Sequence, residues 1–203
     1  MKSTRMVLST LALLAMAVSI LVGSAQGADV KDTLISAVDA STASPTVKTF
    51  IKETLIPHCT NPVFVEQVQT QNAKGLSLDA IKATDQQWAD AEEELTIHEE
   101  LTTNPCAVEV TKIANGHSAI SETFVMDNQG ANVGQNDLTS DYWQGDEPKW
   151  QNSFNHGQGG IDIGKEKLDK STNQVMQQIS LPIIDENGSV IGAVTFGINT
   201  GAL

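Results

Sequence analysis

The sequence predicts an α+β domain, with helices in the first half of the chain and antiparallel β-hairpins in the second half. Apolar residues recur at helical spacing from residue 29 to about residue 116, and their period then changes to two. Two turns rich in Asp, Asn and Gly also divide the second half into paired strands. At 203 residues the chain is long enough to form one domain with its own core.

The first 27 residues are typical of a secretory signal peptide. Lys2 and Arg5 precede an apolar run over residues 6–22, and small residues lie next to position 27, so we expect cleavage after Gly27. An uncleaved anchor is the alternative, although a run of 17 apolar-leaning residues is short for a bilayer span, which needs about 20. With cleavage, residues 28–203 form a soluble periplasmic or secreted domain.

The charge of the expected mature chain restricts the partners it can have. Residues 1–27 contain two of the 12 basic residues and none of the 25 acidic residues, which leaves 10 − 25 = −15 for residues 28–203. Such a field repels nucleic acid and anionic lipid surfaces. It favours a cationic or zwitterionic ligand over a bare anion, although a pocket lined by Lys149 could still hold a carboxylate.

Residues 28–116 are predicted to be mainly helical. Apolar residues between 34 and 55 share one helical face, and Ser44-Pro45 marks a restart or kink, so we expect one long N-terminal helix or two in line. Asn61-Pro62 and Asn104-Pro105 each combine a capping side chain with a proline that suits the first helical turn. Ser77 can cap another helix in the same way.

The sequence contains two cysteines, Cys59 and Cys106. In an exported protein, a pair of this kind forms a structural disulfide more often than a redox centre. Their spacing fits neither a CxxC motif nor a zinc site. We therefore expect a disulfide between them.

Residues 117–203 contain two predicted hairpins. The first strand covers residues 120–126 and ends in the turn 127–130, whereas the second hairpin joins residues 175–184 and 189–199 through the turn 185–188. Between the hairpins we expect a short helix over residues 147–154, capped by Asp146. The last strand has bulky residues on one face and Ala193, Thr195 and Gly197 on the other, which leaves room for a ligand.

The stretch "TSDYWQGDEPKW", residues 139–150, contains the sole tyrosine and two of the three tryptophans. These rings can form the wall of a ligand pocket, in which a carboxylate side chain holds an ammonium group and a lysine holds a carboxylate. The alternative is that the rings pack under the loop while the charges face water. The candidate ligand residues are Asp141, Tyr142, Trp143, Glu147, Lys149 and Trp150, with Gln178 and Thr195 on the small-residue face.

Residues 29–203 resemble the Cache or PDC sensor domains in four segments. These are "SETFVMDNQGANVGQN", "TSDYWQGDEPKW", "DKS" and "QISLPIIDENGSVIGAVTFGIN". The resemblance implies a PAS-like, five-stranded antiparallel sheet backed by the long N-terminal helix, through which such domains also form homodimers. It implies binding of an amino acid, amine or carboxylate, with Asp169 holding an amine. The pattern departs from the family because no second membrane segment or cytoplasmic transmitter follows Leu203.

Enzymatic functions find little support in the sequence. The four histidines are scattered, and we find no nucleophile elbow, phosphate-binding glycine loop or calcium-loop spacing. We expect neither a metal nor a cofactor. The predicted function is that of a small-molecule-binding sensor domain in signal transduction. The alternative is a ligand-free module that docks on a membrane-bound sensor kinase or chemoreceptor.

Overall fold

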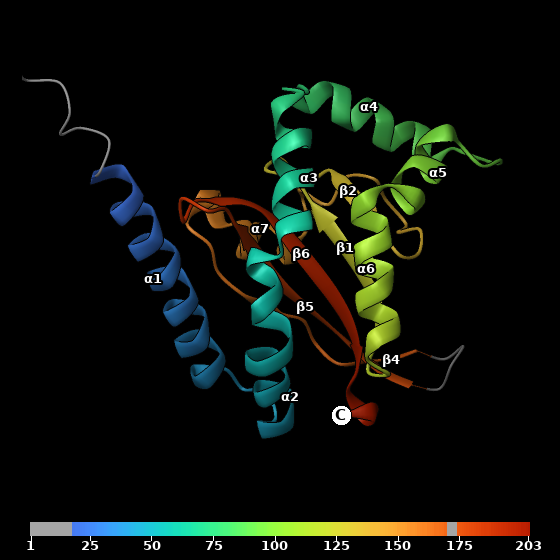
Figure 1. The fold of residues 1–203 in the computed structure, drawn as a ribbon. Coiled ribbons are helices and arrows are strands. Elements are labelled where there is room, and N and C mark those ends of the chain that lie inside the picture. The colour runs from blue at the N-terminus through green and yellow to red at the C-terminus, as the bar shows by residue number, and fades with distance from the viewer. Residues whose placement is uncertain (1–17, 170–173) are drawn as a thin grey trace, which may run out of the picture.

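A six-stranded antiparallel sheet lies at the centre of the computed structural model, which describes residues 18–169 and 174–203 (Figure 1). The strand order is β2-β1-β6-β5-β3, and β4 also pairs with β5. The α+β, PAS-like fold class is confirmed, with six strands in place of the expected five because β3 and β4 share one edge of β5. The strands are β1 (Ile120–Met126), β2 (Asn132–Gln135), β3 (Asp162–Ile163), β4 (Lys167–Asp169), β5 (Gln174–Ile184) and β6 (Val190–Asn199).

Both predicted hairpins are confirmed, and their turns have the same construction. The Oδ1 atom of Asp127 accepts hydrogen bonds from the backbone N–H groups two and four residues later, at 2.8 and 3.0 Å. Asp185 does the same at 2.9 and 2.8 Å. Gly130 and Gly188 have φ angles of 88° and 80°, which side-chain-bearing residues rarely adopt.

The first half of the chain is helical, as predicted. Asn61, Ser77 and Asn104 each cap a helix by accepting a hydrogen bond from a backbone N–H group of its first turn. None of the helices among the described residues is long and apolar enough to cross a membrane. The helical elements are α1 (Val18–Ala40), α2 (Pro45–Phe50), the π-helix η1 (Ile51–Leu55), the 3₁₀-helix η2 (Ile56–Thr60), α3 (Pro62–Ala73), α4 (Leu78–Ala89), α5 (Thr96–Thr103) and α6 (Pro105–Gly116).

The N-terminal helical region is broken at residues 41–44, where the sequence predicts a restart. Leu34 and Val38 of α1 are buried in the core, but α1 packs against η1 and lies outside the layer that covers the sheet (Figure 1). The helical layer in closest contact with the sheet is formed by η2, α3 and α6, and Leu34 and Val38 of α1 pack into the same core as residues of β5 and β6. Residues 1–17 of the expected signal peptide lie outside the described residues, and α1 runs through position 27, so cleavage there stays a prediction.

The two faces of β6 differ as the sequence predicts. Val194, Phe196 and Ile198 lie in the large core between the sheet and the helices. Ala193 lies on the opposite face with Phe124 and belongs to a smaller cluster. Alternation along one strand therefore separates a packed apolar face from a face with small and polar side chains.

Cys59 and Cys106 are free thiols, so the predicted disulfide is wrong for this structure. Cys59 lies in η2 and Cys106 in the first turn of α6, and both side chains are fully buried in the same core cluster. A free cysteine packs in such a core as a small apolar residue. Cysteine count and compartment do not specify the Cβ geometry that a disulfide requires.

Burial raises the pKa of both thiols to about 12, which predicts that they are unreactive in the native protein. Because the thiolate is the reacting species, neither cysteine should react with DTNB at pH 8. Both should react once urea has unfolded the chain, without any reductant. Unfolded protein that releases no thiol until a reductant is added would contain the disulfide instead.

Candidate ligand-binding site

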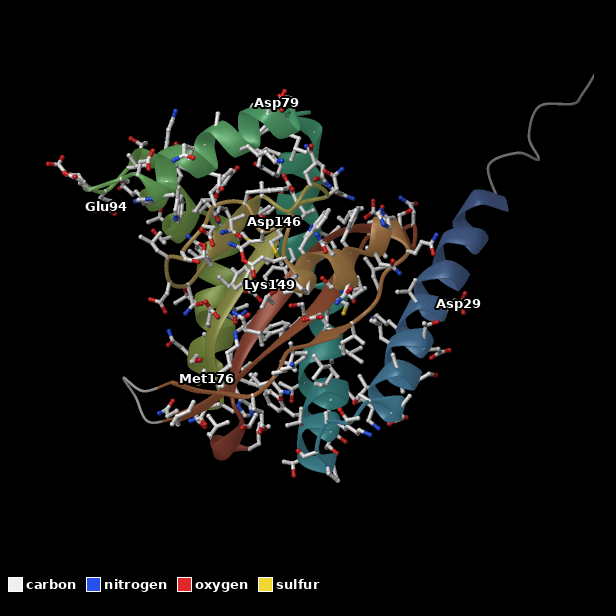
Figure 2. All side chains as sticks on the ribbon, turned by 180° about the vertical axis from the view of Figure 1, so that it is seen from behind. Asp29, Asp79, Glu94, Asp146, Lys149 and Met176 are labelled. Carbon is white, nitrogen blue, oxygen red and sulfur yellow. The ribbon has the colours of Figure 1, made fainter. Side chains whose placement is uncertain are left out.

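The candidate site lies where helix α7 (Pro148–Phe154) covers the sheet face opposite to the helical core. Pro148 occupies the first turn of α7, as predicted, but the N-cap residue is Glu147 rather than Asp146, and no side chain caps this end. Figure 2, which views the molecule from behind, shows Lys149 in front of the strands on the side of α7. The first turn of α7 therefore places a lysine over the sheet.

A row of mostly polar side chains crosses the sheet on this face. In the strand register, Gln135 of β2 lies opposite Phe124 of β1, which lies opposite Thr195 of β6, and Thr195 lies opposite Ser180 of β5. Residues directly opposite each other on neighbouring strands project from the same face. The Ser180 and Thr195 hydroxyls are fully buried and 2.8 Å apart. This face thus offers buried hydrogen-bonding groups on either side of one aromatic ring.

The side chain of Lys149 is only 14% exposed, although it carries a charge. Its Nζ atom lies 5.3 Å from the centroid of the Phe124 ring and 3.1 Å from Oε2 of Glu147. An aromatic face and a carboxylate both attract a cationic side chain. The Nζ atom of Lys149 is therefore held between the ring and the carboxylate, where it can bind an anionic group.

A second polar pair lies two residues further along the strands, on the same face. Nε2 of Gln178 donates to Oε2 of Glu122 at 3.1 Å, and Gly197 separates the two residues in the register. A β-carbon on Gly197 would lie 2.9 Å from the β-carbon of Glu122. The missing side chain at Gly197 thus makes room for Glu122.

Three buried amide side chains gather at the β2 end of the face. The carbonyl oxygen of Asp141 accepts hydrogen bonds from Nδ2 of Asn132 at 3.2 Å and from Nε2 of Gln144 at 2.8 Å. Asn132 also donates to Oε1 of Gln135 at 3.2 Å. We refer to Asn132, Gln135 and Gln144 as the amide cluster. Each of its members has one amide atom without a partner among the described residues.

Trp150 fills part of the space that the sequence predicts for a ligand. Its indole packs on Ala193 and Phe124, stacks on Phe154 at a centroid distance of 5.0 Å, and donates from Nε1 to the backbone oxygen of Asp127 at 3.0 Å. The expected room above Ala193 is therefore occupied by the protein itself. What this face offers a ligand is the row beside the indole, near Lys149 and the amide cluster.

Tyr142 and Trp143 pack in a cluster with apolar residues of α4 and α5, and α5 contacts β2. The Tyr142 ring is buried 6.1 Å from that of Trp88, and burial together with the nearby Asp127 carboxylate raises the pKa of Tyr142 to about 12. Trp143 donates from Nε1 to the oxygen of Gln129 at 2.7 Å and lies under Lys82, whose Nζ is 4.6 Å from the ring centroid. These two rings attach the loop to α4 and α5.

The remaining sequence-predicted residues divide between the face and its surroundings. Gln178 and Thr195 lie on the face, with Glu147 at its rim beside Lys149. The Asp141 side chain accepts from the adjacent Ser140 hydroxyl at 2.8 Å, so this residue contributes its backbone oxygen to the site. Asp169 lies in β4 opposite Gln174, and its side chain lies outside the described residues.

Five residues of this face were not singled out from the sequence as candidate ligand residues. Counting residue pairs outward from the turn 127–130 would place Val133 opposite Phe124, whereas a register shift between Val125 and Met126 places Gln135 there, so the sequence carried no local signal for this residue. The other positions depend on how the loop returns to the sheet. The residues are Glu122, Phe124, Asn132, Gln135 and Gln144.

An open groove of about 620 Å³ lies elsewhere, beside α2 and η1, and shares no residue with the α7 face. Its lining includes Phe50, Glu53, His117 and Leu203, and several of the groove's side chains are exposed. We place the candidate site at α7 because buried polar groups that lack partners are a stronger sign of a ligand than open volume. Within the described ranges, no group of three or more His, Cys, Asp or Glu could hold a metal ion.

Comparisons with known proteins return sensor domains. No protein-family model and no curated protein matches the chain. Among solved structures, the sensor domain of the Vibrio cholerae histidine kinase DctB matches with a TM-score of 0.44 and 14% identity, over 88% of this chain and 58% of that one. The ligand-binding domain of the Campylobacter jejuni chemoreceptor Tlp3, in complex with 4-methylisoleucine, matches with a TM-score of 0.37 and 14% identity, over 89% and 61%.

A third match is the ligand-binding domain of the Pseudomonas aeruginosa amino acid chemoreceptor PctC, in complex with GABA. Its TM-score is 0.33 at 9% identity, over 72% of this chain and 60% of that one. The chain therefore spans less than two thirds of the length of each of these three solved domains. The chain is thus similar, at 9–14% identity, to a histidine-kinase sensor domain and to ligand-binding domains of chemoreceptors.

Proposed function

We propose that this protein is an extracytoplasmic sensor domain that binds a small polar metabolite, an amino acid, amine or carboxylate, between α7 and the sheet. The observation that carries the proposal is the Lys149 ammonium, 14% exposed in front of the buried row that contains Thr195 and Ser180. Removing a charge from water costs free energy unless partners compensate it. A ligand carboxylate would add a second counter-charge beside Glu147.

Binding can be tested with isothermal titration calorimetry and thermal shift against amino acids, amines and carboxylates. For a ligand with a carboxylate, Lys149→Met should weaken binding at least tenfold, since a charge-assisted hydrogen bond contributes roughly 1.5–3 kcal/mol. Lys82→Met is the matched control, because Lys82 also lies over an aromatic ring but on α4. If no compound binds, or if both variants bind alike, the proposal fails.

We further propose that occupancy is reported to a membrane-bound sensor kinase or chemoreceptor. The outer position of α1 supports a role for this helix in partner contact or homodimerisation, and its Ile35 is exposed. Light scattering with and without ligand, together with a pull-down of membrane proteins, distinguishes these roles. A retained membrane partner without any bound small molecule would favour the alternative, a docking module that has no ligand.

A further inference from the structure

We infer that the amide cluster recognises a neutral polar group of the ligand, one that both donates and accepts hydrogen bonds, such as a carboxamide or a hydroxyl. This inference rests on the proposed function and specifies the ligand's chemistry at one end of the same site. Asn132, Gln135 and Gln144 are each at most 1% exposed. Their unpaired atoms are therefore out of reach of bulk water, and leaving them unpaired costs free energy.

The hydrogen bonds of the cluster determine how each amide is turned. A backbone carbonyl can only accept, so Asn132 and Gln144 must present their NH₂ groups to the oxygen of Asp141. Gln135 must in turn present its oxygen to the NH₂ group of Asn132, at 3.2 Å, and it also accepts from the Thr139 hydroxyl at 3.0 Å. Rotating any amide by half a turn would place two donors or two acceptors against each other.

These orientations leave a defined set of unpaired atoms. Oδ1 of Asn132 and Oε1 of Gln144 are acceptors without a donor, and Nε2 of Gln135 is a donor without an acceptor, among the residues that the structure describes. An ammonium group could satisfy the two oxygens but could not accept from Gln135. A carboxylate could accept from Gln135 but could not donate to the oxygens. A carboxamide or a hydroxyl can do both.

Charge points to the same class of group. The three side chains are neutral, and a charged group buried among them would lose hydration without gaining an opposite charge from them. Gln135 lies opposite Phe124 in the register, and Lys149 lies over the ring of Phe124. Opposite residues on neighbouring strands have β-carbons about 5 Å apart, so one short molecule can reach both. The ligand class is thus a short carboxylate with a carboxamide or hydroxyl at its other end.

The test uses the whole protein and three probes of similar length, which are succinamate, succinate and 4-aminobutanoate. Calorimetry should show that succinamate binds at least ten times more tightly than the other two. Gln135→Met and Gln144→Met should each reduce this preference to about one, and Gln87→Met, at an exposed position of α4, should leave it unchanged. The selectivity of the unmodified protein tests the inference even if a variant does not fold.

The outcomes separate this inference from the proposed function. If succinate or 4-aminobutanoate binds as tightly as succinamate, or if the methionine variants keep the preference, the amide cluster is satisfied by water and the inference is wrong. In that case the proposed function survives as long as Lys149→Met still weakens binding. If none of the three probes and no compound of the wider panel binds, the proposed function fails and the inference fails with it.

Discussion

Replacing Gly130 by alanine is expected to destabilise the domain strongly and to separate the first hairpin from the loop that follows it. A β-carbon at this position would lie 2.5 Å from both the Cα and the N atom of Gly145. Both are backbone atoms, so no side-chain rotation relieves the clash. A residue with a β-carbon loses about 1–2 kcal/mol in the left-handed backbone conformation, and overpacking costs about 1–3 kcal/mol. We therefore expect the free energy of unfolding to fall by about 3 kcal/mol.

Gly75→Ala provides the control for this prediction. Gly75 also has a positive φ, 59°, but a β-carbon there would meet nothing within 4 Å. Its replacement should therefore cost only the backbone penalty, about 1 kcal/mol. Urea denaturation of both variants gives the comparison. Equal losses would mean that Gly130 and Gly145 are not in close contact in solution.

Replacing Trp150 by alanine is expected to release α7 from the sheet. The indole packs on Ala193 and Phe124, stacks on Phe154, and donates a hydrogen bond to the backbone of Asp127. Because large-to-small substitutions of packed aromatic residues cost about 3–5 kcal/mol and this indole is only half-buried, we expect a loss of about 3 kcal/mol. Ligand affinity should fall as well, since α7 also carries Lys149.

Trp150→Phe separates the two contributions of the indole. The variant keeps an aromatic ring over Ala193 but removes the Nε1 donor, so it should lose about 1 kcal/mol. Chemical denaturation measures both variants, and hydrogen exchange of the α7 amides reports the release directly. If Trp150→Ala is as stable as the unmodified protein, α7 must be anchored by other contacts.

The sequence predicts the hairpins well because their signals are local. Alternating apolar residues and the turns beginning at Asp127 and Asp185 place β1, β5 and β6 within one or two residues of their observed bounds. The helix starts at Asn61, Ser77 and Asn104 are also predicted by local signals, since each of these side chains caps the first turn of the helix that follows it. Short-range chemistry thus accounts for most of the architecture.

Features that depend on distant segments could not be predicted in this way. The strands β3 and β4 have two and three residues, too few for a periodic pattern to show. Trp143 and Trp150 lie seven positions apart, yet the first packs toward α4 and the second onto the sheet. The path of the loop decides which ring goes where, and the amide cluster likewise exists only because residues 139–144 return to β2.

The short outer strands limit how this sheet can associate with other chains. A long, unpaired outer strand offers a row of free N–H and C=O groups onto which a neighbouring molecule can add, which promotes aggregation. Here one border is formed by the four residues of β2 and the other by the two and three residues of β3 and β4. Strand addition would therefore gain few hydrogen bonds at either border, which favours a domain that stays dispersed at high concentration.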